Sequence, residues 1–182
     1  MMRTVVFGGS FNPVHCGHIA LAQSVLAQGL ADEVWLMVSP QNPLKPQGGL
    51  LCDDDRMALA RRAVADIDGV VASDYEFLLP RPSYTWNTLQ QLQRNFPQRT
   101  FSLLVGGDNW ALFQQWYHWK DILRHYNIIV YPRGGHTGTM QAPLLNVSST
   151  DIRQRVARGE SISGMVPHSI EADVVRLYSV TR

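Results

Sequence analysis

The sequence has few cysteines, no excess of charge and no long hydrophobic run. Only two cysteines, Cys16 and Cys52, occur among 182 residues, and no CxxC pair is present, so neither a disulfide framework nor a four-ligand zinc site is indicated. Charges nearly cancel, with 16 Lys and Arg against 15 Asp and Glu, so binding to nucleic acid or another polyanion is not expected. The first apolar stretch is interrupted by Gly8 and Asn12 and is too short to span a bilayer. We therefore expect a cytoplasmic protein with no membrane attachment, no signal peptide and free thiols.

Two common nucleotide-binding motifs are also missing. The P-loop motif GxxxxGK, followed by Ser or Thr, is not formed because no Lys follows Gly17. The dinucleotide motif GxGxxG does not occur either, so the sequence offers no anchor for a hydride-transfer reaction. The segment that is present instead is GGSFNPVHCGH, which spans Gly8–His18. It follows the apolar run Val5–Phe7 and precedes a helical pattern that begins at Ile19.

This glycine-rich turn has the features of a phosphate site. Backbone N–H groups at the turn and the positive end of the following helix dipole both favour a bound anion. His15 and His18 are three residues apart at the start of that helix, so both imidazoles can reach the same phosphate oxygens. The alternatives are a metal site built on His15, Cys16 and His18, and a polar turn with incidental histidines. The combination of strand, glycine turn, helix start and paired histidines favours nucleotide chemistry.

Apolar runs alternate with amphipathic helical patterns along the chain. Such alternation predicts right-handed βαβ units, and therefore an α/β fold with a doubly wound parallel sheet. No linker, repeat or low-complexity tract divides the chain, so we expect a single domain over residues 1–182. The expected strands are 5–7, 34–38, 70–72, 101–105 and 127–131, and the expected helices are 18–28, 53–64, 85–95, 110–116, 148–158 and 170–178.

Ligands of doubly wound sheets bind beyond the carboxyl ends of the strands, so the polar residues there are candidates for chemistry. Asp108 follows two glycines that permit a close approach, and its carboxylate can accept a hydrogen bond from a ribose or a base. Ser148–Arg153 opens a helix with two hydroxyls and a guanidinium, which indicates a second anion site. Each cluster alone has an ordinary explanation as a helix cap or a surface charge. In chain order the candidates are His15 and His18, Lys45, Gly106 and Asp108, Arg133, and Ser148, Ser149 and Arg153.

These motifs match a known family. The matching segments are GGSFNPVHCGH at 8–18, SPQNPLK at 39–45, RPSYTWNTL at 81–89, VGGDNW at 105–110, YPR at 131–133 and SSTDIR at 148–153. On these segments the chain resembles the HxGH-bearing nucleotidyltransferases and, among them, the bacterial nicotinate-nucleotide adenylyltransferases. Ser83–Thr85, followed by Thr88, is the part that points to a pyridine mononucleotide. The family often has Pro-His-Lys where this chain has Pro43, Leu44 and Lys45.

The resemblance implies a Rossmann-like nucleotidyltransferase fold and an enzyme of NAD biosynthesis. Its reaction joins ATP, with Mg²⁺, and nicotinate mononucleotide into nicotinate adenine dinucleotide and releases pyrophosphate. It implies catalytic roles for His15, His18, Lys45 and Arg153, ATP binding by Gly8, Gly9, Ser10, Phe11, Gly106, Asp108, Arg133, Ser148 and Ser149, and mononucleotide binding by Tyr84, Thr85, Trp116 and Tyr117. The alternatives are the same chemistry on nicotinamide mononucleotide or phosphopantetheine, and a non-catalytic adenine-nucleotide sensor. Association into a homo-oligomer stays open.

Overall fold

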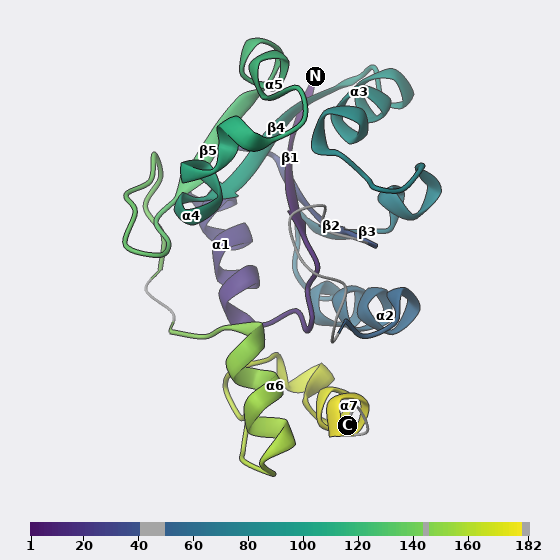
Figure 1. Cartoon of the computed structure of the whole chain (residues 1–182), viewed down its shortest axis with the longest axis vertical. Helices are drawn as coiled ribbons and strands as arrows, with labels where there is room; N and C mark the ends of the chain where they lie inside the picture. The colour runs from purple at the N-terminus through teal and green to yellow at the C-terminus, as the bar shows by residue number, and fades with distance from the viewer. Residues whose placement is uncertain (41–49, 144–145, 180–182) are drawn as a thin grey trace.

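The structure is a computed structural model that describes residues 1–40, 50–143 and 146–179. Within them, five parallel strands form one sheet in the order β3-β2-β1-β4-β5 (Figure 1). The strands are β1 (Met2–Gly9), β2 (Glu33–Val38), β3 (Val70–Ser73), β4 (Arg99–Gly106) and β5 (Asn127–Tyr131). The α/β fold with a parallel sheet, predicted from the alternation of patterns, is confirmed. Strands β1 and β4 are longer than their apolar runs because Met2 also pairs with Arg99 and Arg3 with Thr100.

The helices occupy the intervals between and after the strands. They are α1 (Cys16–Ala27), α2 (Asp53–Val64), the 3₁₀ helix η1 (Tyr75–Leu78), α3 (Thr85–Asn95), α4 (Gly107–Ala111), the 3₁₀ helix η2 (Phe113–Gln115), α5 (Trp119–His125), α6 (Ser149–Ala157) and α7 (His168–Ser179). Helix α2 begins with three aspartates, whose charges suit the positive end of its dipole. None of the described helices is long and apolar enough to cross a membrane.

One expected helix is wrong. The sequence predicts a single helix over 110–116, whereas α4 ends at Ala111, η2 forms the next turn and α5 follows separately. Trp110, Phe113 and Trp116 recur every three residues, a spacing that fits a 3₁₀ turn as well as an α-helix. Phe113 is buried in the core, and the backbone becomes extended at Trp116. The chain therefore turns where the pattern alone suggests that the helix continues.

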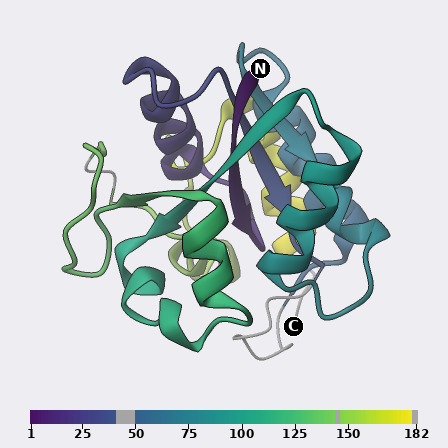
Figure 2. The same ribbon diagram turned by 90° about the horizontal axis from the view of Figure 1, so that it is seen from above.

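Helices cover both faces of the sheet, as Figure 2 shows. Because side chains of a strand alternate between faces, Val5 and Phe7 point into one layer and Val6 into the other. The first layer is packed by α1, α2, α6 and α7, and the second by α3 and α5. Both faces of the sheet are therefore apolar, which explains the continuous hydrophobic run Val34–Val38 in β2.

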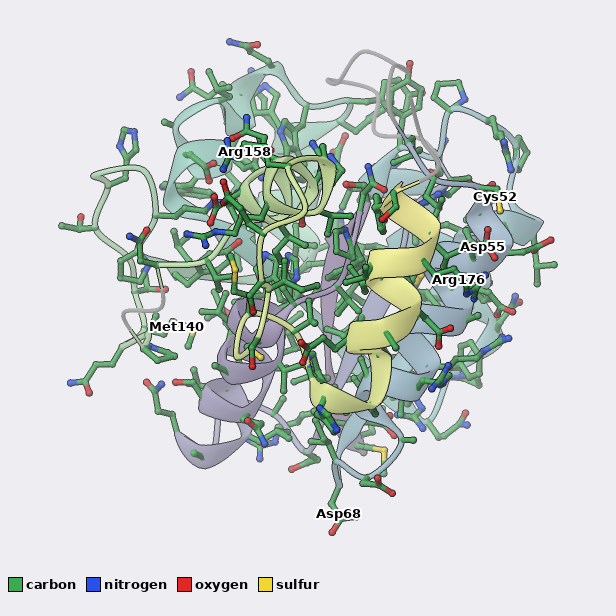
Figure 3. All side chains as sticks on the ribbon, turned by 90° about the horizontal axis from the view of Figure 1, so that it is seen from below. Cys52, Asp55, Asp68, Met140, Arg158 and Arg176 are labelled. Carbon is green, nitrogen blue, oxygen red and sulfur yellow. The ribbon has the colours of Figure 1, made fainter. Side chains whose placement is uncertain are left out.

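Helices α6 and α7 extend the first layer beyond the sheet, below α1 and α2 in Figure 1. Helix α7 packs on α2, where Arg62 forms an ion pair with Asp173 and donates from Nη2 to the carbonyl oxygen of Ser169 at 2.6 Å. Figure 3 shows α7 in yellow beside α2, with Arg176 on the side where Asp55 lies. These contacts fix α7, the last described helix, to α2.

Candidate active site

A cleft of about 770 Å³ opens at the carboxyl ends of β1, β4 and β5, where a doubly wound sheet binds its ligands. A volume of this size is typical of a small-molecule site. The predicted site residues that line the cleft are Gly8, Gly9, Ser10, Phe11, His15, His18, Tyr84, Thr85, Gly106, Trp116, Tyr117, Arg133, Ser148, Ser149 and Arg153. The fold therefore brings most of the residues singled out in the sequence into one cleft.

Two predicted residues stand apart from this set. Lys45 lies outside the described residues. Asp108 is not among the cleft-lining residues: its Oδ2 lies 3.5 Å from Nε of Arg133, and its Oδ1 accepts from the backbone N–H of Asn109 at 2.9 Å. Arg133 lines the cleft and also donates to the hydroxyl oxygen of Tyr131 at 3.2 Å. Asp108 thus orients a cleft-lining arginine, and its contact with adenosine stays a prediction.

His15 and His18 form a stacked pair at the start of α1. Their ring centroids are 3.6 Å apart and their planes differ by 23°. Nδ1 of His15 accepts from the backbone N–H of Gly17 at 3.1 Å, and Nδ1 of His18 accepts from the backbone N–H of His15 at 3.2 Å. A neutral imidazole that accepts at Nδ1 carries its proton at Nε2. Both cleft-lining rings are therefore N–H donors at Nε2, which suits them to an anion.

Burial keeps His15 neutral. The residue is 7% exposed. This burial, with the positive charge of Arg133 as a smaller cause, lowers the pKa of His15 from 6.5 to about 4. At neutral pH His15 therefore offers a hydrogen bond without carrying a charge.

Glycine is required in two of the motifs because the backbone passes close to side chains. A Cβ atom at position 17 would lie 3.0 Å from the His15 ring. A Cβ atom at position 106 would lie 2.7 Å from Oδ1 of Asp108 and 3.0 Å from the Tyr131 ring. A larger residue at either position would displace a side chain at the cleft or the partner of one, so the glycines preserve the geometry of the site.

Phe11 closes one wall of the cleft in an uncommon backbone conformation. Its φ is +44°, in the left-handed region that residues with a side chain seldom adopt. The ring is buried and meets the His18 ring edge-on, with centroids 4.8 Å apart. Strained conformations of this kind persist where the surrounding structure imposes them, often at functional sites. Packing of Phe11 therefore helps to fix the orientation of the His18 ring.

The N-terminus of α6 joins the glycine-rich turn. Ser148 is the N-cap of α6, and its side chain accepts a backbone hydrogen bond of the first helical turn. Ser149 donates from Oγ to the carbonyl oxygen of Pro13 at 2.8 Å, and Arg153 donates from Nη1 to the carbonyl oxygen of Asn12 at 2.7 Å. The two anion sites that the sequence predicts separately are thus parts of one site.

Asn12 also connects the turn to α7. Its Oδ1 accepts from the hydroxyl of Tyr178 at 2.6 Å and from the backbone N–H of Leu51 at 3.2 Å. Tyr178 is 5% exposed, and burial raises the pKa of its hydroxyl well above the usual range, so the hydroxyl stays a neutral donor. The sequence gives no sign of this contact because its two residues are 166 positions apart.

The four residues predicted to bind the mononucleotide come from two segments that meet at the cleft. The rings of Tyr84 and Tyr117 lie with centroids 4.8 Å apart, and Thr85 is the first residue of α3. Trp116 packs on Phe113 with ring centroids 5.1 Å apart. Nε1 of Trp116 is buried and has no hydrogen-bond partner among the described residues. The two segments therefore present aromatic surface to the cleft, beside the N–H groups that open α3.

Sequence reasoning misses two buried charges near the cleft. Arg56 is 0% exposed and Glu76 is 6% exposed. Arg56 falls in the apolar stripe of α2 with Ala60 and Ala63, at helical spacing. A charge within such a stripe is a signal that it has internal partners. Glu76 lies in a short 3₁₀ helix and carries no comparable signal.

The fold and the histidine-bearing turn define the class of protein. Residues 6–155 match the family model described as cytidylyltransferase-like. The chain belongs to this family, and within it to the nicotinate-nucleotide adenylyltransferases, as the relatives below show.

A protein of Bacteroides thetaiotaomicron named "probable nicotinate-nucleotide adenylyltransferase" is 44% identical, over 84% of this chain and 81% of the relative. A protein of the same name from Azobacteroides pseudotrichonymphae is 35% identical, over 96% of this chain and 97% of the relative. A solved structure from Vibrio parahaemolyticus that carries the same family name superposes with a TM-score of 0.75 at 24% identity, over 100% of this chain and 98% of that chain. This structural likeness concerns the fold, and the family rests on the sequence matches.

Proposed function

We propose that the cleft transfers the adenylyl group of ATP to the phosphate of nicotinate mononucleotide, which yields nicotinate adenine dinucleotide and pyrophosphate. The chain is accordingly an enzyme of NAD biosynthesis. Relatives of that name, at 44% identity over 84% of this chain, support this reaction. The single observation that carries it is the pair His15 and His18, which stand at a glycine turn with Nδ1 occupied by backbone N–H groups. Two Nε2–H donors beside backbone donors form a site for a polyphosphate.

The chemical step is an in-line displacement at the α-phosphorus of ATP. A phosphate oxygen of nicotinate mononucleotide forms the new P–O bond, and the bond from the α-phosphorus to the bridging oxygen breaks. Pyrophosphate leaves with the electron pair of that bond. Because the attacking phosphate is already ionised at neutral pH, no general base is needed. The protein therefore acts by positioning the two nucleotides and by stabilising charge.

His18 and His15 stabilise the charge that develops on the phosphates. Each donates one hydrogen bond from Nε2, and the two rings are stacked with centroids 3.6 Å apart. His15 stays neutral because burial lowers its pKa to about 4. His15 therefore holds the triphosphate through a hydrogen bond from a neutral ring. We assign the larger share of transition-state stabilisation to His18.

Arg153 and the N-terminus of α6 take the pyrophosphate. Arg153 lines the cleft and has one donor on the carbonyl oxygen of Asn12, which fixes the guanidinium while other donors serve the anion. The first N–H groups of α6, at Ser148 and Ser149, add the positive end of the helix dipole. Lys45, outside the described residues, is proposed to neutralise charge on the same leaving group.

Magnesium is proposed to enter with ATP as part of the substrate. It would bridge phosphate oxygens and offset the charge of the triphosphate. Among the described residues, no group of three or more His, Cys, Asp or Glu is placed to hold a metal ion. His15, His18 and Arg153, which line the cleft and are proposed to hold the phosphates, are donors and complement the anion itself.

The two nucleotides occupy opposite parts of the cleft. Adenosine is proposed to lie near Gly106 and Arg133 at the ends of β4 and β5, with Asp108 behind Arg133. The pyridine ring is proposed to lie at the aromatic surface of Trp116 and beside Thr85 at the start of α3. Backbone N–H groups beside Thr85 and Tyr117 are proposed to bind the ring's carboxylate.

The two free cysteines bear on location. Cys16 is partly buried and Cys52 is exposed, and neither is in a disulfide. Unpaired thiols suit a reducing compartment, so we propose that the enzyme works in the cytoplasm.

One assay tests the proposed reaction. Pyrophosphate release from ATP and Mg²⁺ is measured with nicotinate mononucleotide, nicotinamide mononucleotide and phosphopantetheine as separate acceptors. We expect release with nicotinate mononucleotide and formation of nicotinate adenine dinucleotide in equal amount. Release with phosphopantetheine alone would assign another acceptor, and ATP binding without release from any acceptor would identify a nucleotide sensor.

A further inference from the structure

Arg56 lies behind the wall of the cleft and holds that wall from inside. Its guanidinium donates to three main-chain carbonyl oxygens: that of Ser10 at 2.6 Å, that of Ser39 at 2.8 Å and that of Leu51 at 2.9 Å. Nη2 pairs with Oδ1 of Asp53 at 2.5 Å. All four partners line the cleft, whereas Arg56 does not. One buried side chain thus fixes separate segments of the cleft wall.

Glu76 lines the cleft and makes a second set of contacts within the neighbouring wall. Its Oε1 accepts from the hydroxyl of Thr88 at 2.8 Å, and its Oε2 accepts from the hydroxyls of Ser83 at 3.1 Å and of Ser39. Burial raises the pKa of Glu76, and the three hydroxyl donors act in the opposite direction. Ser83 and Thr88 flank the start of α3, where the mononucleotide is placed.

Ser39 joins the two sets of contacts. It follows β2, and its backbone N–H donates to the carbonyl oxygen of Gly9 at 2.9 Å. Its carbonyl oxygen accepts from Arg56 while its hydroxyl donates to Glu76. A continuous chain of hydrogen bonds, Arg56–Ser39–Glu76, therefore runs from the turn proposed to hold the triphosphate to the helix start proposed to hold the pyridine mononucleotide.

We propose that Arg56 and Glu76 are positioning residues that hold the two nucleotide subsites at a fixed separation. The inference rests on the proposed function, in which two nucleotides must meet in line. A misplacement of about 1 Å can cost about 10²-fold in such a reaction. A planar guanidinium fork can tie three carbonyl oxygens at once, and an apolar side chain cannot. The two residues support different subsites: Glu76 supports the mononucleotide side, and Arg56 supports the turn at Ser10.

A matched pair of charges at the other end of the sheet serves as the control. Glu33 accepts from Arg99 and from Nε1 of Trp35. Like the buried Glu76, the partly buried Glu33 is therefore a carboxylate with several donors. It does not line the cleft. A role confined to stability predicts that Glu76→Gln and Glu33→Gln behave alike.

The test compares Glu76→Gln, Ser39→Ala and Arg56→Lys with Glu33→Gln. For each, kcat and both KM values are measured by pyrophosphate release, and the unfolding midpoint is measured by circular dichroism. Removing one charged acceptor is expected to raise KM for nicotinate mononucleotide by about 10-fold in Glu76→Gln, with KM for ATP within about 2-fold. Ser39→Ala should reproduce this selectivity, and Arg56→Lys should lower kcat by at least ~10-fold. Glu33→Gln should lower only the midpoint.

Several outcomes overturn the inference. Equal changes in both KM values for Glu76→Gln and Ser39→Ala would do so, as would kinetics that match those of Glu33→Gln. Should Arg56→Lys fail to fold, Glu76→Gln and Ser39→Ala still decide. A parent enzyme that is inactive with every acceptor would overturn the proposed function, whereas an active parent whose variants follow the control would overturn this inference alone.

Discussion

The amino and carboxyl ends of the sheet use the same kinds of charged side chain in different ways. At the amino end, Arg99 pairs with Glu33, donates to Oγ1 of Thr4 at 2.8 Å and lies 5.0 Å from the ring centroid of Trp35. Nε1 of Trp35 donates to the same carboxylate at 2.6 Å. Cation, anion and ring satisfy one another, so this cluster serves stability.

At the carboxyl end, two of the arginines that line the cleft are bound loosely or by neutral oxygens. Arg153 donates to a main-chain oxygen, and its Nη2 lies 3.3 Å from Oγ1 of Thr150. Nε of Arg133 is 3.5 Å from the carboxylate of Asp108. The positive charge of Arg153 and Arg133 is thus held in place without a close carboxylate to neutralise it, so it is available to phosphate. The charge of Arg81 is not, because Arg81 pairs with Asp53 at 2.7 Å. The comparison shows that partners, and not residue types, separate a structural arginine from a functional one.

The largest effect is expected at the carboxyl end, from His18→Ala. Loss of one transition-state donor should lower kcat by at least ~10²-fold, while the unfolding midpoint stays near that of the parent. His168→Ala is the control, because the His168 side chain is fully exposed on α7. A large fall in stability with near-normal activity would place His18 among the structural residues and break the comparison.

The next effect is a pH dependence of stability that comes from His15. The pKa of His15 is 6.5 when unfolded and about 4 when folded, so the unfolded chain binds more protons between these values and stability falls as pH falls from 6.5 to 4. Below pH 4 the free energy of unfolding is lower by about 3 kcal/mol because of this residue than it is above pH 6.5. Denaturant unfolding across this range measures it. His15→Asn, which keeps an acceptor but does not titrate, should lose this part of the pH dependence; an unchanged profile would contradict the assignment.

The pyridine end should distinguish an acid from an amide. Arg81, the cation of the RPSYT segment, is paired with Asp53 at 2.7 Å, so recognition of the ring carboxylate is expected to rest on backbone N–H groups beside Thr85 and Tyr117. The NH₂ of an amide would leave such donors unsatisfied at ~1–3 kcal/mol each, which gives a preference of at least ~10-fold for nicotinate mononucleotide. The ratio of kcat/KM for the two mononucleotides measures it. Equal values would show that the pocket accepts both forms.

A smaller effect is expected from Arg153→Lys. Lysine keeps the charge but loses the planar fork that grips two oxygens. Pyrophosphate should become a weaker product inhibitor, by several-fold, while KM for nicotinate mononucleotide changes little. Arg155→Lys, on the same helix and paired with Asp151, is the control. Unaltered inhibition by pyrophosphate would move the leaving-group site away from α6.

From the sequence, the site at the carboxyl ends of the strands can be predicted better than the buried contacts that support it. The turn at Gly8–His18 is readable because glycines, histidines and a helix start follow one another directly. The buried strands can be predicted because helices cover both faces of the sheet, so each strand is a continuous apolar run. The contacts of the buried side chains cannot be predicted in this way, because their partners come from distant segments that only the folded chain brings together. This holds for Arg56, Glu76 and Tyr178.

The hydrogen bond between Tyr178 and Asn12 has a consequence for the order in which the enzyme is synthesised and folds. A ribosome delivers the chain from its N-terminus, so both histidines and Arg153 are made before the helix that anchors the turn beside them. The nascent chain thus passes through a stage that has these proposed catalytic groups but lacks this anchor. Proteolytic loss of α7 from a finished molecule would return it to that stage. We therefore expect a molecule that has lost α7 to be less active than the intact chain.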